Sequence, residues 1–181
     1  MASRHARLVL PIAERDHIQG PPDAPAILME YGDYECPHCG RAYPIVEAVK
    51  RRLGRRMQFA YRHFPLAEIH PHARRAAEAA EAAGAQGRFW EMHGMLFENQ
   101  HALDDEDLVA YAEHLRLDVP RFVRELGDGT WDPRVREDFM TGVRAGVNGT
   151  PTFFVNGLRH DGPWDAESLL EALITAARLS A

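Results

Sequence analysis

The chain has 181 residues, of which 45% are hydrophobic, and it carries a formal net charge of −6. A chain of this length can bury one well-formed core, and a second domain would have to be small. The acidic balance argues against a protein that binds the phosphate backbone of nucleic acids, and no segment approaches the roughly 20 apolar residues of a membrane span.

The N-terminal segment starts with a basic stretch at residues 1–7, as secretory signals do. The apolar run that follows, Leu8–Ala13, is interrupted by Pro11 and gives way to charged residues at 14–16. A secretory signal needs about 7 to 15 apolar residues. We therefore expect no signal peptide and a cytoplasmic location, or a periplasmic or other extracytoplasmic location if a leader has been removed.

The first strand is predicted at Ile27–Tyr31, after a loop at Gly20–Pro25 that is rich in glycine and proline. We expect residues 1–24 to form an arm that adds an edge strand. Both faces of the predicted strand are apolar apart from Glu30, which is typical of a central strand covered on both sides. Glu30 is therefore expected to be buried.

The chain contains two cysteines, Cys36 and Cys39, and they are separated by Pro37 and His38. The pair lies where a strand gives way to a helical pattern, which puts the first sulfur at a helix N-terminus. Unpaired N–H groups and the positive end of the helix dipole favour a thiolate there, and His38 adds a donor or a cation. Glu35 adds an opposing negative charge. The pattern indicates thiol-disulfide exchange.

A zinc site is the alternative interpretation of the cysteine pair, because Cys-x-x-Cys also binds metals. Structural zinc takes four protein ligands, so histidines would have to supply the other two. None of the ten histidines shows the paired spacing of zinc fingers, and His101 and His114 fall on separate predicted segments. We therefore favour redox chemistry and expect neither a metal nor another cofactor.

A helix is predicted at Cys39–Leu53, with Pro44 expected to kink it. A strand is predicted next, at Met57–Phe64, and the helical crossover makes it parallel to the first strand.

Three histidines come close together in the sequence after this point, at His63, His70 and His72. We expect His70-Pro71-His72 to open the next helix, with proline in its first position. The sequence leaves open whether these histidines serve a metal, the active site or neither.

The segment from His72 to Ala145 is helical by its apolar periodicity and N-cap residues. Helices are predicted at Ala73–Ala83, at Phe89–Asn99, from Asp104, at Val119–Leu126 and from Asp132. Their apolar stripes are expected to form core, and the acidic residues at 104–107 mark a helix start rather than a metal site.

The last segment returns to strands and ends in a helix. Thr152–Val155 and Leu158–His160 flank Asn156-Gly157, which is the strongest short hairpin signal. Asp165–Leu179 is amphipathic and is expected to be the C-terminal helix.

The order of these elements is that of an α/β thioredoxin fold, a mixed central sheet with an inserted helical subdomain. We expect four parts, namely an arm at 1–24, a first part of the fold with the cysteine motif at 25–65, the helical insertion at 66–146, and a second part with the hairpin and C-terminal helix at 147–181.

The sequence resembles the DsbA-like branch of the thioredoxin superfamily, which comprises thiol-disulfide oxidoreductases. The resemblance rests on Cys36-Pro37-His38-Cys39 after a strand, Asn148-Gly149-Thr150-Pro151 before the Phe153-Phe154 strand, and the helical insert between them. It extends from about Pro25 to the end of the chain. It implies that Cys36 is the nucleophile, that Cys39 is the resolving thiol, and that the Thr150–Pro151 bond is cis.

The expected reaction is exchange of a Cys36–Cys39 disulfide or dithiol with protein or peptide substrates through a mixed disulfide. Cys36 should be the exposed sulfur and Cys39 the shielded one. A buried Glu30 would accept the proton of Cys39, unless it is an ordinary strand carboxylate that reaches solvent. The backbone beside a cis proline could pair with an extended substrate segment, so the expected substrate-binding residues are Thr150, Pro151 and Pro37.

Two other classes of function remain open. A glutathione-dependent transferase or isomerase of the kappa type shares the fold, but its chemistry does not need two cysteines. A binding or chaperone module without enzymatic activity would be indifferent to loss of Cys36. The physiological substrate, the partner that resets the disulfide, the direction of electron flow and the oligomeric state are not predicted.

Overall fold

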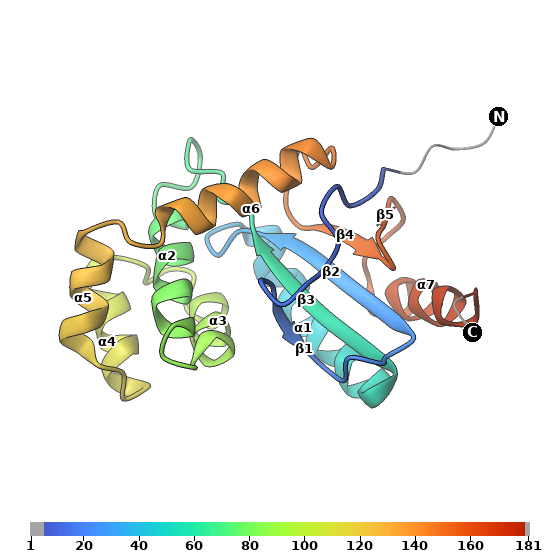
Figure 1. Cartoon of the computed structure of the whole chain (residues 1–181), viewed down its shortest axis with the longest axis horizontal. Helices are drawn as coiled ribbons and strands as arrows, with labels where there is room; N and C mark the ends of the chain where they lie inside the picture. The colour runs from blue at the N-terminus through green and yellow to red at the C-terminus, as the bar shows by residue number, and fades with distance from the viewer. Residues whose placement is uncertain (1–5, 180–181) are drawn as a thin grey trace. The chain divides into compact units, whose positions relative to one another are not determined.

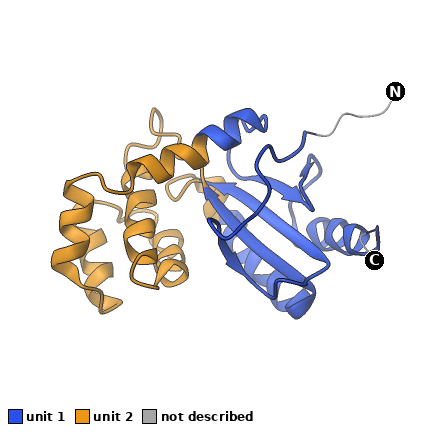
Figure 2. Cartoon of the chain, in the orientation of Figure 1, with its two compact units in different colours: residues 1–32, 41–62, 140–181 blue, residues 33–40, 63–139 orange. Residues whose placement is uncertain are grey.

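The computed structural model describes residues 6–179 (Figure 1), so residues 1–5 of the predicted basic stretch lie outside the described part. The chain divides into two compact units (Figure 2). Among the described residues, unit 1 comprises 6–32, 41–62 and 140–179, and unit 2 comprises 33–40 and 63–139. No helix in the described residues is long and apolar enough to cross a membrane.

Unit 1 is built on a five-stranded sheet with the strand order β1-β3-β2-β4-β5. Its strands are β1 (His17–Gln19), β2 (Ala26–Gly32), β3 (Met57–His63), β4 (Thr152–Val155) and β5 (Leu158–His160). β1, β4 and β5 pair antiparallel with their neighbours, whereas Figure 1 draws β2 and β3 running in the same direction. The predicted mixed sheet and its strand-helix-strand start are confirmed.

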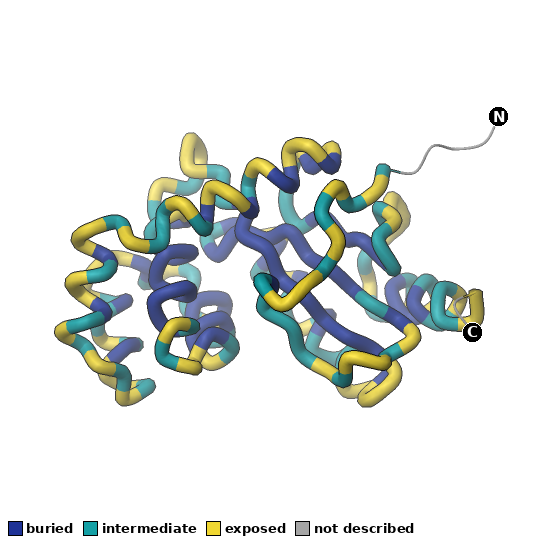
Figure 3. The backbone as a smooth tube through the Cα atoms, viewed as in Figure 1, coloured by how far each residue is buried: buried dark blue, intermediate teal, exposed yellow. Residues whose placement is uncertain are grey.

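The centre of this sheet is the core of unit 1. Figure 3 shows β2 and β3 buried along nearly their whole length. Both faces of β2 are mainly apolar, whereas one face of β3 carries the buried polar side chains of Gln58 and Arg62. Helix α1 (Pro37–Leu53) connects them, and helix α7 (Ala166–Leu179) packs on β2 and β4. α1 contains Pro44, as predicted, and begins at Pro37 rather than Cys39 because proline suits the first helical position.

The β4–β5 hairpin turns at the predicted dipeptide. Asn156 and Gly157 both have positive φ, at 46° and 80°, which the favoured two-residue hairpin turn requires. The Asn156 side chain also accepts a hydrogen bond from the Ile27 N–H at 2.7 Å, which ties the turn to the start of β2.

The N-terminal arm contacts both edges of the sheet. The predicted edge strand is confirmed as β1, in which His17 pairs with Tyr61 of β3. At the opposite edge, Arg7 forms an isolated antiparallel bridge with Leu158 of β5. One segment of chain therefore supplies the outermost backbone on both sides of unit 1.

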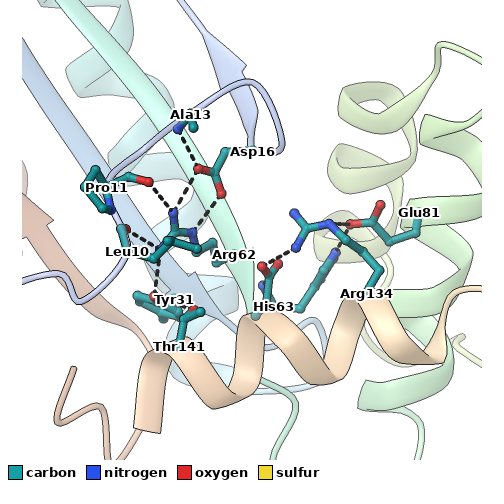
Figure 4. A network of polar contacts seen from close by, with 11 residues as sticks. Leu10, Pro11, Ala13, Asp16, Tyr31, Arg62, His63, Glu81, Arg134 and Thr141 are labelled. Atoms are coloured by element: carbon teal, nitrogen blue, oxygen red, sulfur yellow. Dashed lines mark hydrogen bonds and ion pairs between the residues drawn. The ribbon is translucent and has the colours of Figure 1, made fainter. Parts of the chain in front are cut away.

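A buried guanidinium holds the middle of this arm (Figure 4). Arg62 donates to both oxygens of Asp16, at 2.7 and 2.9 Å, and also to the carbonyls of Leu10 and Pro11 and to the hydroxyl of Tyr31. Burial opposes both charges, but the mutual hydrogen bonds outweigh it, so the pKa of Asp16 lies below its usual value and that of Arg62 above.

Unit 2 is helical. It contains α2 (Ala73–Gly84), α3 (Phe89–Glu98), α4 (Asp105–His114), α5 (Val119–Gly127) and the first part of α6 (Asp132–Arg144). The alanine-rich helix α2 is almost entirely buried and packs on α3, α4 and α5, so the predicted apolar stripes do form core. Asp104 and Asp107 form a capping box at the start of α4, as expected of a helix start.

The predicted start of α2 at Ala73 is confirmed, but the expected proline in its first position is not. The helix begins at Ala73 with His72 as its N-cap, so Pro71 does not occupy the first helical position. The His72 N–H has no acceptor within the helix and donates to a Glu35 carboxylate oxygen at 2.6 Å.

Candidate redox site

The cysteine motif lies at the start of α1 in unit 2. The Gly40 N–H donates to the Cys36 carbonyl at 3.0 Å, which makes Cys36 the residue from which helical hydrogen bonding begins. Cys39 follows in the first helical turn, and both residues are present as thiols. Pro37 and His38 between them are exposed.

The two cysteines differ less in exposure than the sequence suggests. Cys39 is fully buried, as predicted, but Cys36 is only 3% exposed. The expectation of an exposed Cys36 is therefore wrong in degree. Within unit 2, the Gln100 side-chain amide donates to the carbonyls of Tyr34 and Cys36, at 2.8 and 2.9 Å. A side chain at Gly40 would collide with Gln100.

Asp33 anchors the turn before the nucleophile. One of its carboxylate oxygens accepts from the N–H groups of Glu35 and Cys36, at 2.8 and 3.2 Å. The other accepts from the Leu66 N–H at 2.9 Å and lies 2.8 Å from Nδ1 of His70. The Asp33 side chain is fully buried, and its carboxylate connects the backbone at Cys36 with Leu66 and His70.

Glu35 is paired rather than isolated. Its two oxygens face the N–H and Nδ1 of His72, at 2.6 and 2.8 Å, and the Nε2 of His72 lies 3.0 Å from Asp104. The hydrogen bond with Glu35 raises the pKa of His72, burial opposes this increase, and the negative charges of Glu35 and Asp104 add to it. The negative charge of Glu35, which the sequence predicted to oppose a Cys36 thiolate, therefore has a partner.

His63 belongs to a buried polar cluster of unit 2 (Figure 4). Its Nε2 lies 2.9 Å from a Glu81 oxygen, its N–H donates to Asp138 at 3.1 Å, and Arg134 pairs with Asp138. These contacts give His63 a role in packing polar groups within the helical unit.

Unit 1 contains the other predicted site residues. Glu30 is 2% exposed in β2, opposite Phe153 of β4, so its predicted burial is confirmed and a solvent-facing carboxylate is excluded. The peptide bond between Thr150 and Pro151 is cis. Pro151 directly precedes β4, whose first residue, Thr152, donates its hydroxyl proton to the Gly149 carbonyl at 2.7 Å.

Two residues that contact the motif, Asp33 and Gln100, were not predicted from the sequence. Asp33 had a local signal, because an aspartate three residues before Cys36 can accept that residue's N–H. Gln100 had none, since it lies 64 residues away in the chain. His72 was noted without a partner, because its pairing with Glu35 crosses 37 residues.

A sequence model described as thioredoxin matches residues 13–174. The Na(+)/H(+) antiporter NhaA 1 of Salinispora arenicola is 46% identical over 170 residues, which are 93% of this chain and 26% of that protein. The Na(+)/H(+) antiporter NhaA of Herminiimonas arsenicoxydans is 41% identical over 165 residues, which are 91% of this chain and 26% of that protein. The chain spans about a quarter of the length of the curated relatives it matches.

Solved structures resemble the chain over nearly its whole length. BdbD from Bacillus subtilis, in its oxidised form, has a TM-score of 0.82 at 21% identity, covering 96% of this chain and 97% of that one. A thioredoxin-like oxidoreductase from Silicibacter pomeroyi has a TM-score of 0.81 at 24% identity, with coverages of 93% and 95%. The alpha-DsbA1 protein of Wolbachia pipientis has a TM-score of 0.80 at 20% identity, covering 96% of each chain. At these identities the likeness shows the fold.

Proposed function

The chain belongs to the thioredoxin family, and from this premise we propose that it is a thiol-disulfide oxidoreductase of the DsbA type. The observation that carries the proposal is the placement of Cys36 and Cys39 at the N-terminus of α1, with Cys36 at the helix cap. Backbone N–H groups and the helix dipole there stabilise a thiolate, which is the attacking species in disulfide exchange. The antiporter names belong to longer relatives, and the match covers 26% of the length of the Salinispora arenicola protein. The proposed function concerns only the matched segment.

The proposed reaction takes place in two displacements. The Cys36 thiolate attacks one sulfur of a protein or peptide disulfide, forming a mixed disulfide and releasing one substrate thiolate. Cys39 then loses its proton and attacks the Cys36 sulfur, which releases the second substrate thiolate and leaves a Cys36–Cys39 disulfide. Two electrons pass to the substrate, and the same steps in reverse oxidise a substrate dithiol. A separate redox partner has to reset the pair in either case.

We propose roles for the remaining site residues. Glu30 accepts the proton of Cys39 during resolution, because it is a buried carboxylate in β2, the strand that precedes the cysteine motif. Thr150, Pro151 and Pro37 bind the substrate, with the backbone of Thr150 pairing with an extended segment. His38 stabilises the Cys36 thiolate.

Equilibration with glutathione tests the proposed function. The protein is incubated over a range of ratios of reduced to oxidised glutathione, and its thiols are counted by alkylation and mass spectrometry. We expect one two-electron transition between dithiol and disulfide. Cys36→Ser should abolish it, whereas Cys39→Ser should leave a mixed disulfide with glutathione at Cys36.

Two results would contradict this function. Catalysis with glutathione that survives Cys39→Ser would favour a kappa-type transferase. A thiol count that does not change over the whole range of glutathione would favour a binding or chaperone module.

Replacing His38 by proline should make the pair more reducing. The reduced form would lose an interaction that the disulfide form does not have, and we expect the equilibrium constant for oxidation by glutathione to rise about threefold or more. His38→Gln is the control, because it removes the imidazole without changing the backbone. An unchanged or more oxidising potential in both variants would show that His38 does not act on the sulfur.

A further inference from the structure

His72 lies between two carboxylates at the start of α2. On one side is Glu35, the residue directly before Cys36, and on the other is Asp104, the N-cap of α4. Both ring nitrogens are within hydrogen-bond distance of a carboxylate oxygen, at 2.8 and 3.0 Å. The imidazolium is the form of histidine in which both nitrogens donate, so this geometry favours the charged ring.

Other charged groups face the same surface pocket, which is lined by Pro71, His72, Arg75, Leu103, Asp104, Asp105 and Glu106. Arg75 of α2 is paired with Asp105 through two hydrogen bonds, at 2.8 and 3.0 Å. The His72 side chain is 44% exposed and can exchange its proton with solvent. Within unit 2, the described charged groups around the ring are therefore Glu35, Asp104 and Glu106 together with the Arg75–Asp105 pair.

We propose that His72 is a positioning residue that controls the stability of the Cys36 thiolate through Glu35. This role rests on the proposed exchange at Cys36. It holds both oxygens of the Glu35 carboxylate, and its positive charge offsets the negative charge next to the nucleophile. A neutral His72 leaves that charge uncompensated, which disfavours the thiolate and hence the reduced form.

The redox potential of the Cys36/Cys39 pair should depend on pH through His72. The pKa of His72 is raised above its ordinary value of 6.5, so the offset is present at lower pH and is lost as the pH rises through the raised value. As the pH rises through the pKa of His72, the Cys36/Cys39 pair should become more reducing. This change should be larger than the change that the titration of the two thiols produces.

The test compares the wild type with His72→Gln in glutathione buffers between pH 6 and pH 9. Below the pKa of His72 the variant should have an equilibrium constant for oxidation about two- to fivefold higher, the range of partly exposed charge pairs. The two curves should converge at high pH, where His72 is neutral. His114→Gln, at the exposed end of α4, is the matched control and should follow the wild type.

A double-mutant cycle assigns the effect to Glu35. In a Glu35→Gln background, His72→Gln should no longer change the equilibrium constant, because the charge to be offset is gone. The reciprocal effect is measurable without any variant, since the pKa of His72 followed by NMR should be about 0.3 to 0.7 higher in the reduced protein than in the disulfide form.

Three outcomes would overturn this inference alone, provided that the wild type exchanges with glutathione. They are coincident curves, a shift of the same size at every pH, and a His72 pKa that is independent of redox state. A wild type that does not exchange at all would contradict the proposed function and this inference together.

Discussion

Replacing Arg62 by methionine should lower the free energy of unfolding by about 3–5 kcal/mol, the usual cost of removing one partner of a buried ion pair. Methionine has similar volume but cannot donate, so the fully buried Asp16 carboxylate would lose two hydrogen bonds. The carbonyls of Leu10 and Pro11 would each lose a donor as well. Urea denaturation followed by circular dichroism measures the change.

Two further variants isolate the cause of this loss. Arg52→Met removes an exposed ion pair with Glu167 and should cost no more than about 1 kcal/mol. Arg62→Met combined with Asp16→Leu should recover part of the stability, since no charge is then left buried without a partner. A double variant as unstable as the single one would contradict this account.

Replacing Glu30 by glutamine should prolong the life of a mixed disulfide between Cys36 and a model peptide about a hundredfold, which is typical of a lost proton acceptor. Glutamine keeps the shape of the buried side chain but cannot take the proton of Cys39. Quenched-flow alkylation followed by mass spectrometry gives the decay rate of the mixed disulfide.

The attack step provides the internal control for Glu30→Gln. Alkylation of Cys36 by a small reagent should change little, because a thiolate needs no base, and Cys39→Ser gives the upper limit in which the mixed disulfide is not resolved. Equal slowing of attack and resolution would assign Glu30 to the general electrostatic field of the site. Unchanged rates for both steps would remove it from the mechanism.

The sequence predicted those features that short-range chemistry determines. Asn156-Gly157 demands a tight hairpin wherever it lies between two strands, and a two-sided apolar strand buries Glu30 because both of its faces are covered. Strand, helix and hairpin positions therefore agree with the prediction to within one or two residues at most ends. The match to the thioredoxin family agrees with the resemblance noted in the cysteine motif.

The surroundings of Cys36 were beyond prediction because they depend on contacts between distant segments. Asp33 accepts from the Leu66 N–H, and Glu35 pairs with His72, 37 residues away. No periodicity or spacing in the sequence brings these segments together, since loop contacts follow from how the helices of unit 2 pack.

The arm at residues 6–19 has a consequence for how the protein behaves at high concentration. Open strand edges invite pairing with a second chain, and short outer strands reduce that risk. Here the outermost backbone is a three-residue strand on one side and a single bridge at Arg7 on the other, both too short to serve as a template for a further strand. Because Arg62 and Asp16 hold the chain between these two places, one buried ion pair also protects the sheet against edge-to-edge aggregation.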